Sequence, residues 1–195
     1  VSSARAQPLR AALQPWQWLG LAYLPKGELG QLRRAEALDT APRMQGRAVL
    51  PAFYVNELIM RLAPRQDPLP GLYRAYAEVS WQLGQGEGLA WALRRFERDL
   101  LGELGLGMDL SCDSEGQPLQ PERTYRMDPE HGLRHQGGQG AHPLVPGSAL
   151  QALAIDQCPD TATLASLRLP MRTLLAHHLG GRGLQSWQMA ASLAR

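Results

Sequence analysis

The sequence has few of the residues that build covalently or metal-stabilised folds. It holds only two cysteines in 195 residues, Cys112 and Cys158. Two cysteines cannot supply a disulfide framework or a four-cysteine zinc site. No apolar run approaches the roughly 18 uncharged residues that a membrane-spanning helix needs. The sequence therefore predicts neither a disulfide scaffold, nor a structural zinc protein, nor a membrane-spanning protein.

A secretory signal is also lacking, because no basic N-terminal segment leads into a continuous apolar stretch. Together with the scarcity of cysteine, this predicts a protein of the reducing cytoplasm. Hydrophobic residues make up 44% of the chain and charged residues 19%. This composition provides enough apolar material for a sizeable core, in one domain or two small ones.

Lysine is almost absent. Lys26 is the single lysine, and the other nineteen basic residues are arginines. Arginine binds phosphate and carboxylate groups through a planar, bidentate fork. Two interpretations stay open at this point. One is a GC-rich genome that favours arginine codons, and the other is an anionic partner such as nucleic acid or an acidic peptide.

The charges are unevenly distributed, although the net charge is only +2. Residues 1–96 hold twelve basic and seven acidic residues, whereas residues 97–130 hold three basic and nine acidic residues. No acidic residue follows Asp160, while four arginines do: Arg168, Arg172, Arg182 and Arg195. Both ends of the chain are therefore candidates for contact with an anion.

The N-terminal part reads as β-structure. An apolar, aromatic run from Trp16 to Leu24 suits a strand, Lys26 and Gly27 suit a hairpin turn, and residues 28–38 suit a return strand. Two or three strands do not form a stable sheet alone. We expect either that they pack on the rest of the chain or that strands preceding them are missing, and we favour the second explanation.

From about Arg47 the periodicity becomes helical. Apolar residues recur three and four positions apart, which gives one buried face to each predicted helix. We predict helices over about 47–63, 71–83, 89–104, 147–156 and 160–178, with a last one starting near 184–186.

Residues 108–146 are irregular and rich in glycine and proline, and residues 123–127 and 132–135 are expected to pair as a short hairpin. This segment contains His131, His135 and His142, with Glu130 nearby. Because the segment is irregular, no pair of these ligands is expected to be set on a helix or in a zinc knuckle. A small metal-dependent hydrolase that uses these histidines is kept as an alternative function.

Three groups of arginines are candidate anion-binding residues. Arg94 and Arg95 lie mid-helix beside an apolar face, where one of them could receive a carboxylate at the rim of a pocket. Arg168 and Arg172 lie four residues apart on one helix face and, with Arg182, could contact phosphates. A third group surrounds two tryptophans on the predicted strands, a pattern typical of single-stranded DNA surfaces: Arg5, Arg10, Lys26, Arg33 and Arg34, with Trp16 and Trp18. For each group, an ordinary solvated or salt-bridged arginine is the competing interpretation.

Five short segments, in this order and spacing, resemble the RecO family of bacterial DNA repair proteins. They span nearly the whole chain: Leu9–Pro15, Phe53–Leu58, Leu93–Glu97, Leu100–Gly105 and His178–Ser186. The resemblance implies an α+β, mainly α fold. Residues 1–43 would be a partial OB-fold that lacks its first strands. Residues 44–195 would be the helical C-terminal domain with a short irregular, β-hairpin insertion.

The resemblance also implies a recombination mediator without enzymatic activity, cofactor or metal, located in the cytoplasm near the nucleoid. Such a protein binds and anneals single- and double-stranded DNA. It also binds RecR and the acidic, apolar tail of single-stranded-DNA-binding protein, and so helps to load RecA. By similarity, Arg94, or alternatively Arg95, would receive the carboxylate of that tail, and Arg5 and Arg10 would contact DNA. Some members carry a four-cysteine zinc site in the irregular segment, where this sequence has only Cys112. An adaptor that binds no DNA is a further alternative.

Overall fold

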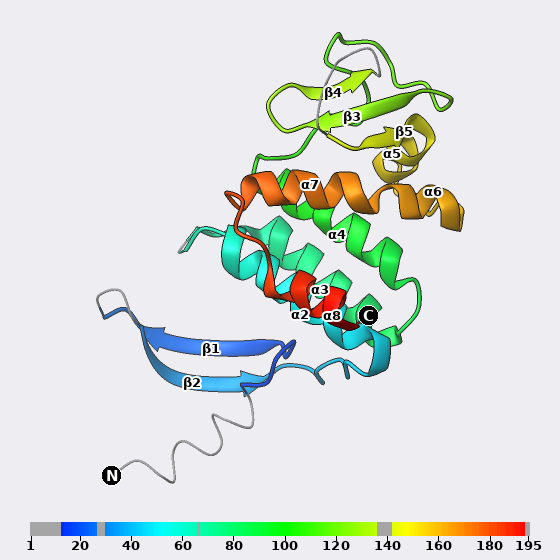
Figure 1. The fold of residues 1–195 in the computed structure, drawn as a ribbon. Helices are drawn as coiled ribbons and strands as arrows, with labels where there is room; N and C mark the ends of the chain where they lie inside the picture. The colour runs from blue at the N-terminus through cyan, green and yellow to red at the C-terminus, as the bar shows by residue number, and fades with distance from the viewer. Residues whose placement is uncertain (1–12, 27–29, 66, 136–141, 194–195) are drawn as a thin grey trace. The chain divides into compact units, whose positions relative to one another are not determined.

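The computed structural model describes residues 13–26, 30–65, 67–135 and 142–193, and these form two compact units that divide between Met44 and Gln45. Helices account for 48% of the described residues and strands for 16%, so the fold is mixed and mainly helical. Each unit is coloured along the chain in Figure 1. The predicted domain boundary lies one residue earlier, after residue 43.

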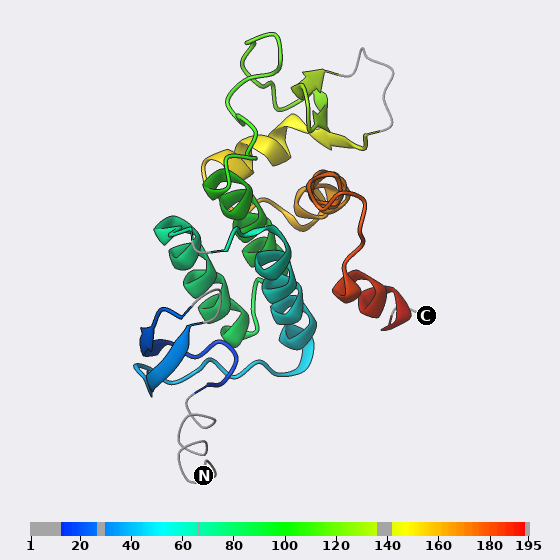
Figure 2. The ribbon, with the colours of Figure 1, turned by 90° about the vertical axis from the view of Figure 1, so that its left-hand side faces the viewer.

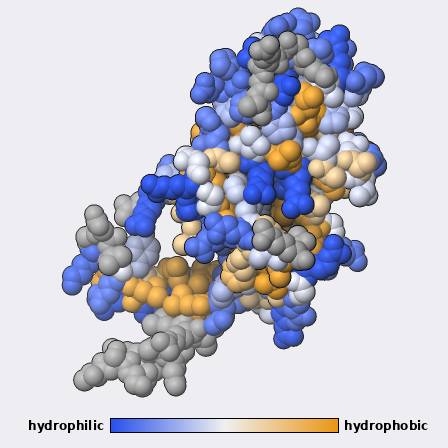
Figure 3. Space-filling view, in the orientation of Figure 1, coloured by the Kyte–Doolittle hydropathy of each residue, from blue (hydrophilic) through white to orange (hydrophobic). Residues whose placement is uncertain are grey.

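The first unit contains a single antiparallel hairpin of β1 (Leu19–Leu24) and β2 (Gln31–Ala37). Of the predicted turn, Lys26 is described and Gly27 lies outside the described residues. Arg5 and Arg10 also lie outside them. The cross-strand pairs on one face are all apolar: Leu19 with Ala37, Leu21 with Ala35, and Tyr23 with Leu32. Leu21 and Tyr23 are more than half exposed, and apolar side chains gather on the hairpin surface in Figure 3.

The second unit begins with the short helix η1 (Gly46–Ala48) and three longer helices, α2 (Val49–Leu62), α3 (Pro70–Gln85) and α4 (Leu89–Glu103). α2 and α3 both pack against α4. The apolar positions of the predicted faces are largely buried: Leu58, Val79, Leu83, Phe96 and Leu100 are at most 3% exposed. Phe53, which shares the predicted spacing, is half exposed.

A small sheet follows, with β3 (Thr124–Asp128) in the centre between β4 (Gly132–His135) and β5 (Leu144–Pro146). β3 and β4 form the predicted hairpin, but β5 was missed in the sequence. Tyr125, Met127 and Leu133 point into the core of this unit, and α7 packs against β3. β5 pairs with β3, and α5 (Gly147–Ala154) begins at the residue after β5.

The predicted helix over 160–178 is two helices, α6 (Thr161–Ser166) and α7 (Arg168–His178), with Leu167 between them. Pro170 explains the interruption, because it has no N–H to donate to the carbonyl of Ser166. Asp160 starts α6 by accepting hydrogen bonds from the backbone of Ala162 and Thr163. Figure 1 shows α7 between the small sheet and α4, Figure 2 shows it along its axis, and α7 contacts both β3 and α4.

The last helix, α8 (Gln185–Leu193), returns to the start of the unit and packs on α2. Residues more than 120 positions apart therefore meet within the second unit. In the described part of the chain, no helix combines the length and the apolar character that crossing a membrane requires.

Candidate functional site

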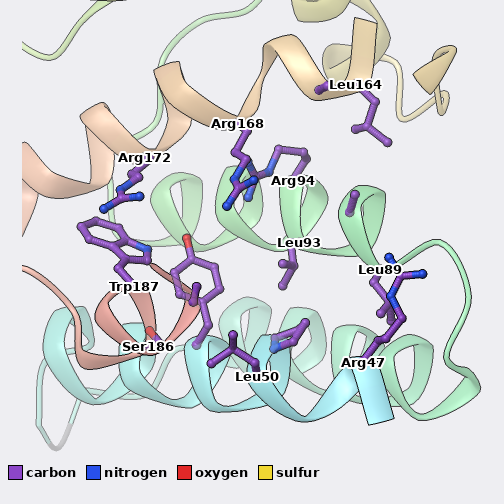
Figure 4. A pocket seen from close by; sticks show the side chains of 15 residues that line it. Arg47, Leu50, Leu89, Leu93, Arg94, Leu164, Arg168, Arg172, Ser186 and Trp187 are labelled. Carbon is purple, nitrogen blue, oxygen red and sulfur yellow. The ribbon is translucent and has the colours of Figure 1, made fainter. Parts of the chain in front are cut away.

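A pocket of about 450 Å³ lies within the second unit, where five helices and η1 converge. Figure 4 shows α2 and α8 on one side of it, α4 behind it, and α6 and α7 on the opposite side. We call it the arginine pocket. Its lining comes from every one of these elements: Arg47, Leu50, Pro51, Tyr54, Leu89, Ala90, Leu93, Arg94, Leu164, Ala165, Arg168, Arg172, Ser186, Trp187 and Ala190.

The lining is apolar apart from its arginines and two hydroxyl groups. Leu50 on α2, Leu89 and Leu93 on α4, and Leu164 on α6 supply the larger aliphatic side chains (Figure 4). Four arginines line the pocket, whereas none of the acidic residues in the described part does. A concave apolar surface with a few convergent charged groups is the usual form of a ligand site. This combination suits a ligand that is both apolar and negatively charged.

The four arginines differ in exposure. Arg94 is buried and its guanidinium pairs with Glu97, one turn along the same helix. Glu97 has no exposed surface, and its Oε1 also accepts a hydrogen bond of 2.6 Å from the Tyr54 hydroxyl. Arg47, Arg168 and Arg172 are exposed, and none of the three forms an ion pair with a described residue.

The buried charges change the ionisation of their neighbours. Desolvation raises the pKa of Glu97, although the charge of Arg94 and the hydrogen bonds from Tyr54 and Arg94 act in the opposite direction. Burial, and next the charge of Glu97, raise the pKa of Tyr54 well above its ordinary value. Tyr54 therefore remains a neutral hydrogen-bond donor at physiological pH.

Trp187 on α8 forms one end of the pocket. The guanidinium of Arg172 lies over its ring, with 4.6 Å between Cζ and the ring centroid. The Tyr54 ring is tilted against the same indole at 6.5 Å between centroids. In Figure 4 the Arg172 side chain extends from α7 to the indole ring. A cation and an aromatic ring at this separation attract each other.

The start of α8 is bound to α2 by Glu57. One carboxylate oxygen accepts a 2.8 Å hydrogen bond from the backbone N–H of Gln185, and the other accepts bonds of 2.9 and 2.7 Å from the N–H and hydroxyl of Ser186. A carboxylate at a helix N-terminus also interacts favourably with the helix dipole. Glu57 thus holds the helix that carries Ser186, Trp187 and Ala190 into the pocket.

A family model for the C-terminal part of recombination protein O matches residues 43–188, which hold every residue of the arginine pocket except Ala190. The full chain is 58% identical to a DNA repair protein RecO from Stenotrophomonas maltophilia and covers 82% of its length. It is 51% identical to the protein of that name from Xanthomonas euvesicatoria, covering 83% of it. The chain belongs to the RecO family.

Further relatives have the same name. A DNA repair protein RecO from Xylella fastidiosa is 49% identical over 98% of this chain and 81% of its own length. Membership of the family places the chain among proteins of DNA repair and recombination, and the resemblance stated from the five sequence segments is confirmed.

Three of the five RecO-like segments contribute residues to the arginine pocket or to its buried ion pair. Tyr54 comes from the segment 53–58, Leu93, Arg94 and Glu97 come from the segment 93–97, and Ser186 ends the last one. Arg168 and Arg172, which the sequence assigned to DNA phosphates, line the same pocket as Arg94. Their spacing of four and eight positions from Leu164 was the signal that could have placed them there.

Arg95 lies apart from the pocket lining. It forms ion pairs of 2.9 Å with Glu78 on α3 and 2.6 Å with Asp156 after α5. Its helical position, one residue after Arg94, turns it to the neighbouring face of α4. Arg95 was predicted as the alternative receptor for a ligand carboxylate. Its guanidinium is already paired with two carboxylates of the protein.

The remaining predicted residues have separate places in the fold. Lys26, Arg33 and Arg34 are exposed in the first unit, where Arg34 pairs with Glu36. Arg182 is exposed between α7 and α8. Trp16 is half-buried and Trp18 is 40% exposed.

The three histidines of the hydrolase alternative serve structural contacts. His131 pairs with Asp128, His135 packs edge-on against Tyr125, and the carbonyl of His142 accepts a hydrogen bond from Arg126. Across residues 13–26, 30–65, 67–135 and 142–193, no group of three His, Cys, Asp or Glu side chains could hold a metal ion.

Proposed function

We propose that this chain is a recombination mediator whose arginine pocket binds the acidic, apolar C-terminal tail of single-stranded-DNA-binding protein. The observation that carries the proposal is the pocket lining of four arginines, several leucines and no acidic residue among the described ones. A tail with a terminal apolar side chain and a free carboxylate presents the complementary chemistry. The binding requires no acid, base or metal.

In this proposal DNA is bound through charge neutralisation by exposed basic residues. The first unit supplies Lys26, Arg33 and Arg34 on its hairpin, and Trp16 and Trp18 precede the first strand. Cations and aromatic rings together suit single strands. Arg182 is exposed in the second unit. Annealing follows when neutralised strands are held with their bases free to pair. RecR and, indirectly, RecA are the proposed protein partners in loading.

The apolar face of the hairpin supports the assignment of residues 1–43 to part of an OB-fold. Leu19, Leu21 and Tyr23 form a row that two strands alone cannot bury. The RecO proteins that match the chain are longer than it, since it covers 81–83% of their lengths. We propose that further strands of the barrel cover this row in the longer relatives.

The test is fluorescence anisotropy with a labelled peptide of the tail, titrated with the chain at several salt concentrations. We expect saturable binding that weakens with salt, and weaker binding by Arg94→Ala, because Arg94 supports the pocket wall. Arg74→Ala is the matched control, since Arg74 is an exposed arginine on α3 outside the pocket. Absence of binding by a chain shown to be folded would overturn the proposal.

A second measurement separates the mediator from an adaptor that binds no DNA. Labelled oligonucleotides, single- and double-stranded, are titrated at the same salt concentrations, and annealing of complementary strands is followed by fluorescence. Salt-dependent binding and accelerated annealing are expected for the mediator. An adaptor would bind the peptide and leave both DNA signals unchanged.

A further inference from the structure

A second cavity, of about 370 Å³, lies at the end of α4. Its lining comes from the last turn of α4, the connection that follows it, β3, α5 and α7, and includes Met108, Met127 and Met171. We call it the methionine pocket. Figure 2 shows α5 next to α4, where Arg98 Nη1 donates a hydrogen bond of 2.6 Å to the carbonyl of Leu153. The methionine pocket and the arginine pocket have no lining residue in common.

The methionine pocket has an apolar floor. Five of its apolar residues are at most 3% exposed: Leu101, Met127, Leu153, Met171 and Leu174. Met108 and Leu110 are half-buried, and Asp109 between them is exposed. Methionine side chains are flexible and polarisable, so a lining that contains several of them adapts to apolar groups of different shape. The pocket therefore suits an inserted apolar side chain.

Gly102 keeps the pocket open toward solvent. It lies one residue before the end of α4, although glycine is the least favourable helix residue apart from proline. A Cβ atom at this position would meet no other atom within 4 Å, and the backbone does not have the positive φ that favours glycine. Gly102 lines both the methionine pocket and a second hollow between α3 and α4. A larger side chain there would project into the space where the two hollows meet.

Acidic groups predominate along the two hollows. Four acidic and two basic residues line them: Glu78, Asp99, Glu103, Asp109, Arg74 and Arg98. The charge of Arg98 is compensated by ion pairs with Asp99 and Asp156. Glu103 and Asp109 form no ion pair with a described residue. These two carboxylates are therefore available to a cation from a partner.

Asp109 is held as a carboxylate at the edge of the methionine pocket. Its Oδ1 accepts hydrogen bonds of 2.6 Å from the hydroxyl and 2.8 Å from the N–H of Ser111. These bonds, the hydroxyl first, lower the pKa of Asp109 below its ordinary value. The C-terminal end of α4 adds the partial negative charge of the helix dipole. The apolar floor thus lies below a rim of negative charge.

We propose that the methionine pocket binds a basic, apolar segment of a protein partner. An apolar side chain of the segment enters between the methionines, and an arginine or lysine beside it interacts with Glu103 and Asp109. The charge of the rim argues for this partner, because it attracts a basic segment and repels an acidic peptide or a nucleic acid strand. α4 thus presents a basic pocket along its first half and an acidic one at its last turn.

The experiment titrates the chain with the peptide Gly-Arg-Leu-Arg-Leu-Arg-Gly, which carries an uncharged dye and an amidated C-terminus. This peptide has no acidic group, so the arginine pocket does not attract it. Two comparison peptides replace the leucines by serine or the arginines by glutamate. We expect saturable binding of the first peptide. The serine peptide should bind about 10- to 100-fold more weakly, from lost apolar burial. The glutamate peptide should bind at least about 10-fold more weakly, from repulsion.

A variant that fills the space at Gly102 locates the binding. Gly102→Gln should weaken binding at least about 10-fold and leave the thermal stability unchanged or raised, because glutamine favours a helix more than glycine does. Ala162→Gln introduces the same side chain at an exposed position of α6 outside both hollows, and should bind the peptide like the wild type.

A second variant tests the carboxylates. Glu103→Gln, Asp109→Asn should weaken binding of the arginine peptide about 3- to 10-fold and reduce its dependence on salt, while the serine peptide is unaffected. Asparagine retains an oxygen that can accept the hydrogen bonds from Ser111. The matched control is Asp67→Asn, Glu87→Gln, which removes two exposed acidic groups outside the hollows.

Three results would overturn the assignment. The first is undiminished binding by Gly102→Gln, which would place the peptide elsewhere on the chain. The second is equal binding of the three peptides, or no binding of any, by a wild-type chain shown to be folded. The third is self-association in sedimentation velocity that Gly102→Gln abolishes, which would assign the methionine pocket to a second copy of the chain. Binding of the acidic tail at the arginine pocket is measured separately and can hold or fail independently.

Discussion

The guanidinium of Arg172 lies 4.6 Å from the ring centroid of Trp187 and so connects α7 to α8 across the end of the arginine pocket. The two helices otherwise belong to different parts of the second unit, since α8 packs on α2 and α7 packs on the small sheet. The pair is therefore a direct contact between two walls of the pocket. Loss of either side chain should affect binding through the shape of the pocket.

We predict that Trp187→Ala weakens binding of the tail peptide and lowers the free energy of unfolding by about 1–3 kcal/mol, from lost apolar burial and the cation–π contact. Trp187→Phe keeps an aromatic face for Arg172 and should recover most of both losses. Urea unfolding and peptide titration measure the two effects. Equal losses for Ala and Phe would contradict a role for the ring in this contact.

The second prediction concerns Glu57. Its carboxylate accepts hydrogen bonds from the N–H of Gln185 and from the N–H and hydroxyl of Ser186 at the start of α8. Glu57→Gln should lower the free energy of unfolding by about 1 kcal/mol, a modest loss because the group is partly solvated. It should also weaken peptide binding, since Trp187 and Ser186 lose their anchor. Glu87→Gln, an exposed acidic residue on the α3–α4 connection, is the matched control.

The same contact makes stability depend on pH. Desolvation acts to raise the pKa of Glu57, but the hydrogen bonds from Ser186 and Gln185 and the charge of Arg61 together lower it below its ordinary value of 4.5. A lowered pKa in the folded state gives stability that is present above pH 4.5 and is lost as the pH falls through the folded-state value. The difference in unfolding free energy between wild type and Glu57→Gln should therefore shrink on acidification below pH 4.5. A difference that grew there would contradict the assignment.

Local sequence patterns predicted the helices well, because each apolar spacing reflects one buried face, as at Leu58 and Phe96. Contacts between distant residues were not predictable in this way. Tyr54 and Glu97 are 43 positions apart and Glu57 and Ser186 are 129 apart, so no local period relates them. The arginine pocket is made of such contacts. The pairing of Arg94 with Glu97 has a local signal, because the two residues lie three positions apart on one helix. That Arg47, Arg168 and Arg172 would line one pocket with them has no such signal.

The buried ion pair of Arg94 and Glu97 yields a prediction about stability. Glu97→Gln keeps a hydrogen-bond acceptor for Tyr54 but leaves Arg94 buried without its counter-charge, and should cost about 3–5 kcal/mol of unfolding free energy. The double variant Arg94→Leu, Glu97→Leu removes both charges and should cost less, about 1–2 kcal/mol, mainly because the Tyr54 hydroxyl loses its partner. Chemical unfolding of the two variants measures this order, and a larger loss in the double variant would show that the pair itself stabilises the fold.

The last prediction concerns which arginines contact DNA. Each phosphate that a single strand loses as a contact should reduce the slope of log affinity against log salt by about 0.7. The double variant Lys26→Ala, Arg33→Ala should therefore reduce the slope by about 1.4, because both side chains are exposed on the hairpin. The double variant Arg168→Ala, Arg172→Ala should leave the slope unchanged, because the proposed function assigns the arginines of the pocket to the peptide tail. Oligonucleotide titrations over a salt series decide between the two roles. A reduction of about 1.4 in the second variant would assign Arg168 and Arg172 to phosphate, as their spacing alone suggests, and would place DNA and the peptide tail in competition for the same side chains.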